Sequence, residues 1–94
     1  MSLSPATKVI DVRDATEFAS GHVQGAINLN VENGDLEAAF AGLDKEAGYT
    51  VYCRSGRRSA IAADLMAKAG FTKVTDLGAL EDAAKSLSLP IVTN

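Results

Sequence analysis

The sequence predicts an α/β protein built around a mostly parallel sheet, and two observations carry that prediction. Short apolar runs of strand length alternate along the chain with longer segments whose apolar residues recur at helical spacing. In proteins with this alternation, helices connect strands that run parallel to one another. The chain has 94 residues, the length of one domain, and we expect residues 1–94 to fold as a single unit.

The first strand and the first helix are predicted before residue 21. The apolar run Lys8–Val12 is typical of a buried strand. Asp14 and Glu17 have the spacing of a capping box, which predicts that a short helix begins directly after Asp14. Gly21 is expected to end this helix.

A turn, a second strand and an amphipathic helix are predicted next. Gly21–Gly25 is typical of a turn, and Gly25–Leu29 of a turn that leads into a short strand. Asn33–Asp35 predicts the start of a helix, and Gly42 lies near its end. The apolar residues of this segment follow at i, i+3, i+4 and i+7, the stripe of an amphipathic helix: Leu36, Ala39, Phe40 and Leu43.

The second half of the chain repeats the alternation of strand and helix. Tyr49–Tyr52 predicts the third strand, and Ser59–Ala69 predicts the longest helix, which ends at Gly70. The remaining residues predict a fourth strand, a last helix and a tail, at Lys73–Asp76, at Leu80–Leu87 and from Pro90 onward.

Composition and charge exclude several classes of function. The net charge of −3 does not favour nucleic-acid binding. No apolar run approaches the roughly 20 residues of a membrane span. The chain does not begin with the pattern of a signal peptide, which favours a cytoplasmic protein. A periplasmic protein whose signal peptide had been removed would have the same sequence, and the oligomeric state is left open.

The most informative residue is Cys53, the only cysteine of the chain. It lies where the third strand meets the longest helix, beside three arginines. Nearby cations and the N–H groups at a helix N-terminus both lower the pKa of a thiol. In parallel sheets, ligands bind at the carboxyl ends of the strands, which is where Cys53 lies. A buried structural cysteine is the alternative, and the arginines favour a functional thiolate.

Four blocks of the chain resemble, in order, those of the rhodanese (thiosulfate sulfurtransferase) homology domain. They are VIDVR at 9–13, EF at 17–18, GHVQGAIN at 21–28 and VYCRSGRRSA at 51–60. The resemblance is greatest to the short, single-domain phage-shock-protein-E type. It implies a small rhodanese-like fold, in which helices flank both faces of the mostly parallel sheet.

The resemblance implies a sulfur transfer in two steps, with Cys53 as the catalytic nucleophile. The Cys53 thiolate would attack the outer sulfur of a small anionic donor such as thiosulfate, sulfite would leave, and Cys53 would hold a persulfide. A second nucleophile, either cyanide or a thiol or protein in the cell, would then take the sulfur. No cofactor is implied.

The loop after Cys53 fits this chemistry. Its backbone N–H groups can cradle an anionic persulfide, and Gly56 permits the tight curl that this requires. The arginines can attract the donor, and which of them does so is left open. Ser59 either donates a hydrogen bond to the sulfur or caps the helix. The loop residues predicted to bind the substrate are Arg54, Ser55, Gly56, Arg57, Arg58 and Ser59.

Two positions differ from the family pattern. Ser55 occupies a position that is often basic in larger thiosulfate-using members, which leaves the natural donor open. Leu77–Leu80 stands where the family usually has two glycines and an apolar residue, often followed by a tryptophan that this chain lacks. We expect this second difference to alter packing near the loop rather than the chemistry.

Two other classes of protein are alternatives. A small cysteine phosphatase or arsenate reductase also uses a thiolate at a helix N-terminus, but cysteine phosphatases place an arginine one position beyond Arg58, where this chain has Ser59. A reductase that resolves through an internal disulfide needs a second cysteine. The other alternative is a non-catalytic module, either a persulfide carrier or a regulatory binding domain, and the rate of persulfide formation on Cys53 distinguishes it.

Three residues near the site are predicted to be structural. Asp11 and Arg13 flank Val12, so their side chains leave the same face of the strand end and are expected to tie neighbouring loops together. His22 has the pKa of a possible general base, but its glycine-bounded turn favours a structural, hydrogen-bonded role. One histidine and one cysteine do not supply a usual metal-ligand set, so no metal site is predicted.

Overall fold

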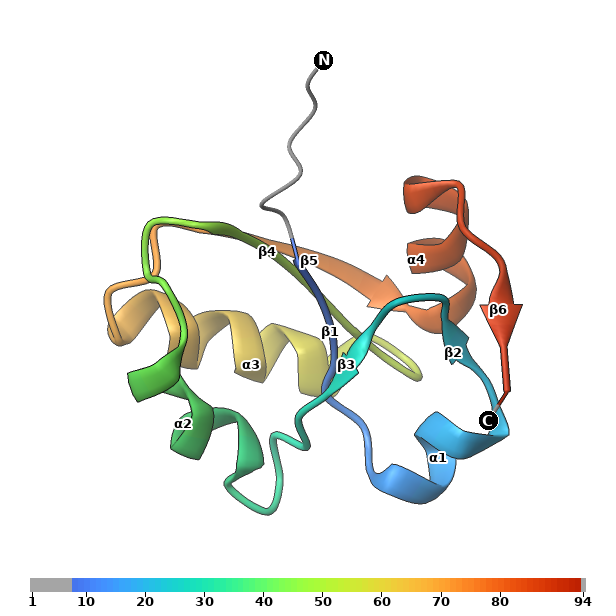
Figure 1. Cartoon of the computed structure of the whole chain (residues 1–94), viewed down its shortest axis with the longest axis horizontal. Coiled ribbons are helices and arrows are strands. Elements are labelled where there is room, and N and C mark those ends of the chain that lie inside the picture. Colours follow the sequence, from blue (N-terminus) through green and yellow to red (C-terminus); the bar gives the residue numbers. More distant parts are fainter. Residues whose placement is uncertain (1–7, 94) are drawn as a thin grey trace.

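Four parallel strands form the centre of the protein, in the order β3-β1-β4-β5 (Figure 1). The computed structural model describes residues 8–93. The expectation about a signal peptide concerns the start of the chain, which lies outside the described residues. The strands of this sheet are β1 (Lys8–Asp11), β3 (Ile27–Asn28), β4 (Gly48–Cys53) and β5 (Lys73–Ala79). The predicted α/β class with a parallel sheet is therefore confirmed.

Helices cover both faces of the sheet. The elements that alternate with the strands are α1 (Ala15–Ser20), α2 (Asp35–Ala39) with the 3-10 turn η1 (Phe40–Gly42), α3 (Arg57–Lys68) and α4 (Leu80–Leu87). Leu36 of α2 and Met66 of α3 pack in one buried cluster with Ile10 and Val51. On the opposite face, α4 packs over Tyr52 in a second cluster. The period-2 alternation of β4 produces this division, because successive side chains point to opposite faces.

Most predicted elements are present, with differences at their ends. The last helix has the predicted bounds, and α1 carries the predicted capping box, in which Asp14 accepts a hydrogen bond from the N–H of Glu17 at 2.8 Å. The longest helix begins two residues earlier than predicted, at Arg57. The strand predicted at Lys73–Asp76 continues to Ala79 as β5, across a register shift in its pairing with β4.

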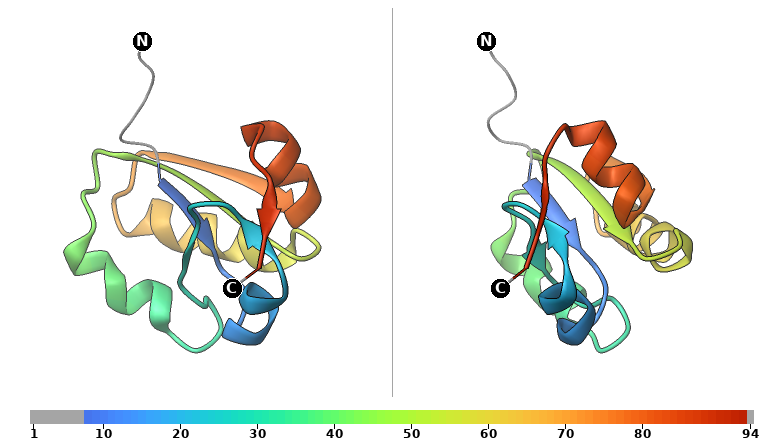
Figure 2. Two further views of the ribbon diagram at one scale, coloured as in Figure 1. Left: turned by 45° about the vertical axis from the view of Figure 1, so that its right-hand side comes forward. Right: turned by 90° about the vertical axis from the view of Figure 1, so that its right-hand side faces the viewer.

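The prediction was wrong for two short segments. The residues predicted as a turn contain β2 (His22–Val23), and the predicted tail contains β6 (Ile91–Val92). These two strands pair in an antiparallel ladder and lie side by side in both views of Figure 2. Two-residue strands have no measurable sequence period, and this pairing joins distant parts of the chain, so no local pattern indicates it.

The sheet brings the carboxyl ends of β1 and β4 together. Asp11 at the end of β1 is in register with Tyr52, the residue before Cys53, and the N–H of Val12 donates to the carbonyl of Tyr52 at 3.1 Å. The residues that follow these two strands, one set leading into α1 and the other into α3, therefore lie next to each other. All candidate site residues except His22 lie at these strand ends, in the segments that follow them, or in the first turn of α3.

Candidate active site

The Cys53 sulfur lies inside the turn that joins β4 to α3. Cys53 is the last residue of β4 and is fully buried. The N–H of Gly56 donates to its Sγ at 2.9 Å. Gly56 has φ +98°, a conformation that favours glycine, and it bends the turn back over the sulfur. The α3 helix then begins with no hydrogen bond from a capping side chain, so its first N–H groups remain available to the sulfur.

The surroundings of the sulfur lower the pKa of the Cys53 thiol. Burial alone would raise it, because a thiolate loses its hydration. Hydrogen bonds from Ser59, both from its hydroxyl and its N–H, and from the N–H groups of Gly56 and Ser55 outweigh this effect. The net direction is downward, which increases the fraction of nucleophilic thiolate at neutral pH.

Ser59 lies at the centre of this arrangement and is fully buried in the first turn of α3. Its Oγ is 3.6 Å from Cys53 Sγ and also donates to the carbonyl of Gly56 at 3.1 Å. The hydroxyl carries one proton. It can therefore accept from a Cys53 thiol while it donates to Gly56, or donate to a Cys53 thiolate. The helix-cap alternative for this side chain is not observed, because α3 has Gly56 at its N-cap.

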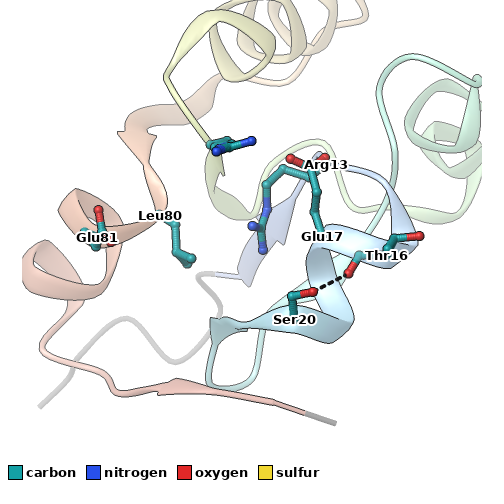
Figure 3. Close-up of a pocket in the computed structure, with 7 residues that line it drawn as sticks. Arg13, Thr16, Glu17, Ser20, Leu80 and Glu81 are labelled. Carbon is teal, nitrogen blue, oxygen red and sulfur yellow. Dashed lines mark hydrogen bonds between the residues drawn. The ribbon is translucent and has the colours of Figure 1, made fainter.

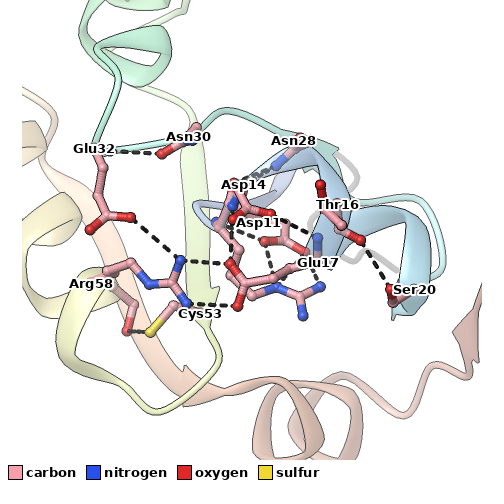
Figure 4. Close-up of polar contacts among 12 residues, drawn as sticks. Asp11, Asp14, Thr16, Glu17, Ser20, Asn28, Asn30, Glu32, Cys53 and Arg58 are labelled. Atoms are coloured by element: carbon pink, nitrogen blue, oxygen red, sulfur yellow. Dashed lines mark hydrogen bonds and ion pairs between the residues drawn. The ribbon is translucent and has the colours of Figure 1, made fainter.

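The three loop arginines have different partners. Arg58 forms a bidentate pair with Glu17 of α1, with Nη1–Oε1 at 2.7 Å and Nη2–Oε2 at 2.9 Å, and it lies 3.6 Å from Glu32 (Figure 4). These hydrogen bonds lower the pKa of Glu17 to about 2. Within residues 8–93, Arg54 and Arg57 have no carboxylate partner, and both are exposed. Arg58 therefore joins the loop to α1, while the other two remain available to an anion.

Asp11 and Arg13 form a buried ion pair beside the loop. Arg13 Nη2 and Nε donate to the two carboxylate oxygens of Asp11 at 2.6 and 2.9 Å, and Nη2 also donates to the carbonyl of Gly21 at 2.6 Å. The guanidinium lies over the ring of Tyr52, 5.7 Å from its centroid. This pair holds the segment after β1 against the turn before β2, which is the kind of connection between loops that the sequence predicts.

His22 lies on β2 and contacts α1. Its Nδ1 is 2.8 Å from the carbonyl of Phe18, and its ring stacks on that of Phe18 with centroids 3.8 Å apart. Because a carbonyl only accepts, Nδ1 carries the proton in this contact. The arrangement gives His22 a role in packing β2 against α1.

Two pockets flank the cysteine loop. The first, called here the α1–α4 pocket, has a volume of about 540 Å³ and lies between α1 and the start of α4 (Figure 3). Its lining residues are Arg13, Thr16, Glu17, Ser20, Arg54, Leu80 and Glu81. The second, called here the α3 pocket, has a volume of about 580 Å³ and is lined by Val31, Glu32, Ser55, Arg57, Arg58 and Ile61. All three loop arginines face one pocket or the other.

The departure from the family pattern at Leu77–Leu80 lies directly against the loop. Gly78 has φ +78°, and a Cβ at Gly56 would lie 3.6 Å from its Cα. Leu80 forms part of the wall of the α1–α4 pocket. This segment therefore packs against the loop, and the expectation that it alters packing rather than chemistry stays a prediction.

The sequence did not identify the carboxylates of the site. Glu17 was interpreted only as part of a capping box and of the family pattern, and Glu32 and Glu81 were not singled out. The partners of Arg58 lie far from it along the chain, so only their position after neighbouring strands could have indicated them. Within residues 8–93, no group of three or more His, Cys, Asp or Glu side chains is placed to hold a metal ion. No helix in the same range is long and apolar enough to cross a membrane.

The parallel α/β sheet, with a thiol in a helix-opening loop at a strand end, has the architecture that the resemblance to the rhodanese domain implies. Residues 2–82 match the family model described as Rhodanese-like domain. The chain belongs to this family. The resemblance expected from the sequence is therefore confirmed.

The similar proteins include named sulfurtransferases. The chain is 39% identical over 75 residues to "Thiosulfate sulfurtransferase PspE" of Escherichia coli, covering 80% of this chain and 72% of that protein. It is 36% identical over 77 residues to "Thiosulfate sulfurtransferase GlpE" of Shewanella oneidensis, covering 82% and 74%. A solved structure described as "rhodanese with anions from E. coli" has a TM-score of 0.79 and 35% identity, covering 95% of this chain and 100% of that one.

Proposed function

We propose that this protein transfers a sulfane sulfur from thiosulfate, or a similar small anion, to a thiophilic acceptor through a persulfide on Cys53. The observation that carries the proposal is the position of the sulfur: Sγ accepts the N–H of Gly56 at 2.9 Å inside a helix-opening turn. The names of the relatives support thiosulfate as the donor. The lowered pKa of Cys53 supports a thiolate as the reacting species.

The reaction consists of two displacements at sulfur. The Cys53 thiolate attacks the outer sulfur of thiosulfate, a new S–S bond forms, and the S–S bond of the donor breaks. Sulfite leaves with the bonding electron pair. An acceptor nucleophile then attacks the outer sulfur of the persulfide, and Cys53 leaves as a thiolate. No net oxidation of the protein occurs, so no further redox partner is required.

The cradle of N–H groups stabilises the anionic persulfide. A hydrogen bond donated to the sulfur stabilises its anionic form, both in the Cys53 thiolate and in the persulfide, relative to the neutral thiol. Cys53 is fully buried, so we expect a donor to reach the sulfur through local movement of the short segment 54–56, in which Arg54 and Ser55 are exposed. Arg57 and Arg54 attract the donor, because they lack carboxylate partners within the described residues.

The phosphatase-like alternative receives no support from the loop arginines. A phosphate cradle needs an arginine that grips the oxyanion, and the arginine nearest to the required position is Arg58. Its guanidinium is held by both carboxylate oxygens of Glu17. The site therefore favours a small sulfur species over a phosphate ester.

The decisive experiment is intact-protein mass spectrometry after brief incubation with thiosulfate. We expect the wild type to gain the mass of one sulfur atom, to lose it on addition of cyanide, and to release thiocyanate. Cys53→Ser should gain no mass while retaining the same unfolding transition, which separates chemistry from folding. A gain in the mutant would overturn the assignment of Cys53. A gain in the wild type without turnover would identify a persulfide carrier instead of an enzyme.

A further inference from the structure

The two pockets beside the cysteine loop differ in the charges that line them. The α3 pocket is lined by Arg57, Arg58 and Glu32. Arg58 is already paired with Glu17 and lies 3.6 Å from Glu32, so Arg57 is the cation of this pocket without a carboxylate partner among residues 8–93. The α1–α4 pocket contains two arginines and two carboxylates, and is balanced. A small anionic donor is therefore attracted to Arg57 on the α3 side. The α1–α4 pocket suits a ligand that carries both signs of charge.

Two of the four charges in the α1–α4 pocket are already neutralised within the protein. Arg13 is paired with Asp11, and Glu17 is paired with Arg58. Among residues 8–93, neither Arg54 nor Glu81 has an ion-pair partner. The pocket therefore presents one uncommitted cation and one uncommitted anion.

These two charges belong to different walls of the pocket. Arg54 comes from the cysteine loop, and Glu81 from the first turn of α4. Figure 3 shows Leu80 and Glu81 on one side of the pocket, with Arg13, Glu17 and Ser20 on the other. The apolar Leu80 precedes Glu81 in the same wall. A ligand with a short carbon chain, an ammonium and a carboxylate would meet complementary groups in this pocket.

The pocket lies beside the loop that holds the reacting sulfur. Cys53 in β4 is in register with Ala79 in β5, and the chain segments that leave this pair form pocket walls. Arg54 directly follows Cys53, and Leu80 directly follows Ala79. In the persulfide, the S–S bond of about 2.0 Å places the reactive outer sulfur beyond the buried Sγ. An acceptor in this pocket would lie beside the loop that carries that outer sulfur.

We propose that the α1–α4 pocket binds the sulfur acceptor, and that this acceptor is a small zwitterionic thiol of the amino-acid type. The inference rests on the proposed persulfide chemistry. The carboxylate of the acceptor pairs with Arg54, and the ammonium pairs with Glu81. The thiolate of the acceptor attacks the outer sulfur and forms an S–S bond, while the bond to Cys53 breaks. The products are the acceptor persulfide and the Cys53 thiolate.

The test measures how fast the loaded enzyme transfers its sulfur to three related thiols. Wild type and variants are loaded with thiosulfate, desalted, and mixed with L-cysteine, with cysteamine, which lacks the carboxylate, or with 3-mercaptopropionate, which lacks the ammonium. Intact mass at timed intervals gives the rate constant for loss of the persulfide. Each variant is compared with wild type for the same thiol, so the intrinsic reactivity of each thiol cancels.

Each variant should slow only the thiols that carry the matching charge. Glu81→Gln should slow transfer to cysteine and cysteamine by about threefold or more, as expected for a solvent-accessible ion pair, and leave 3-mercaptopropionate unaffected. Arg54→Gln should slow cysteine and 3-mercaptopropionate by a similar factor, and spare cysteamine. Asp82→Asn is the matched control for Glu81, because it removes a charge from the same helical turn outside the pocket.

The outcomes separate the inference from the proposed function. Arg57→Gln is the control for Arg54, because it removes a loop cation that lines the α3 pocket, and it should alter loading and not acceptor preference. Equal effects of Glu81→Gln on all three thiols, or no effect, would overturn the inference while persulfide loading still supports the function. If the wild type never gains sulfur, both the function and the inference fail.

Discussion

Two turns lie side by side at the carboxyl end of the sheet, and they satisfy their backbone groups in different ways. After β1, the carboxylate of Asp11 accepts from Arg13, and Asp14 caps α1 with a complete capping box. After β4, no side chain caps α3, and Gly56 donates its N–H to the sulfur of Cys53. Both turns lead from a parallel strand into a helix, so their difference does not come from the fold.

The comparison of the two turns distinguishes a turn with a structural role from the turn in which we propose the chemistry. A helix N-terminus leaves N–H groups that need acceptors. In the turn after β1 (residues 12–14), called here the closed turn, the carboxylate of Asp14 supplies such an acceptor. In the turn after β4 (residues 54–56), called here the open turn, one sulfur atom is the acceptor. A persulfide can replace a thiolate there without loss of hydrogen bonds. The turn that lacks a cap is the one in which we propose the chemistry.

The largest effect on stability is expected in the closed turn, at Asp11. Asp11→Ala leaves the buried Arg13 guanidinium without its carboxylate, so we expect the free energy of unfolding to fall by about 3–5 kcal/mol. Asp14→Ala, which removes an exposed cap, should cost only about 1 kcal/mol. Urea unfolding at neutral pH measures both values. Similar losses in the two variants would show that the buried pair is not what closes the turn.

The open turn is tested at Gly56. Gly56→Ala places a Cβ on a residue with φ +98°, which costs about 1–2 kcal/mol, and relief of that strain moves the N–H away from Cys53. We expect both lower stability and much slower persulfide formation. Gly34→Ala is the matched control, because Gly34 has φ +90°, open space around its Cα, and lies at the N-cap of α2. Its stability loss should be similar, with normal persulfide formation.

The contact that joins the two turns, Glu17 with Arg58, should have a smaller effect that depends on pH. Both side chains are partly exposed, at 23% and 19%, so Glu17→Gln should lower the free energy of unfolding by about 1 kcal/mol at neutral pH. Because the pKa of Glu17 is lowered from 4.5 to about 2, its stabilisation is complete above pH 4.5 and is lost as the pH falls toward 2.

Urea unfolding of the wild type and Glu17→Gln between pH 7 and pH 2 measures this difference. Glu32→Gln is the control, because Glu32 is 67% exposed and 3.6 Å from Arg58, and it should change stability little. A difference between the wild type and Glu17→Gln that persists at pH 2 would contradict the assignment.

The same comparison explains what the sequence could predict. The open turn is a set of consecutive residues, so the thiol, the arginines and Gly56 were all visible as one local pattern. The closed turn was predicted in part, because Asp11 and Arg13 are two residues apart and share a face of the strand end. The pair of Glu17 with Arg58 connects the two turns. These residues are 41 positions apart, so no local sequence pattern indicates their contact. The pairing of β2 with β6 was missed for the same reason.

A substitution at Ser59 tests whether one hydroxyl lowers the pKa of Cys53 in the open turn. Its single proton can serve either Gly56 or the Cys53 thiolate, so Ser59→Ala should raise the pKa of Cys53, because the burial that disfavours the thiolate remains while a donor is lost. The rate of alkylation of Cys53 by a neutral reagent, measured across a range of pH, gives the midpoint of the thiol titration directly. We expect the wild-type midpoint to lie below that of a free cysteine and the Ser59→Ala midpoint to lie above that of the wild type. Ser55→Ala, which keeps its backbone N–H and removes only an exposed hydroxyl, should match the wild type. An unchanged midpoint in Ser59→Ala would assign the lowered pKa to the backbone N–H groups alone, and the open turn would then owe its chemistry entirely to the missing cap.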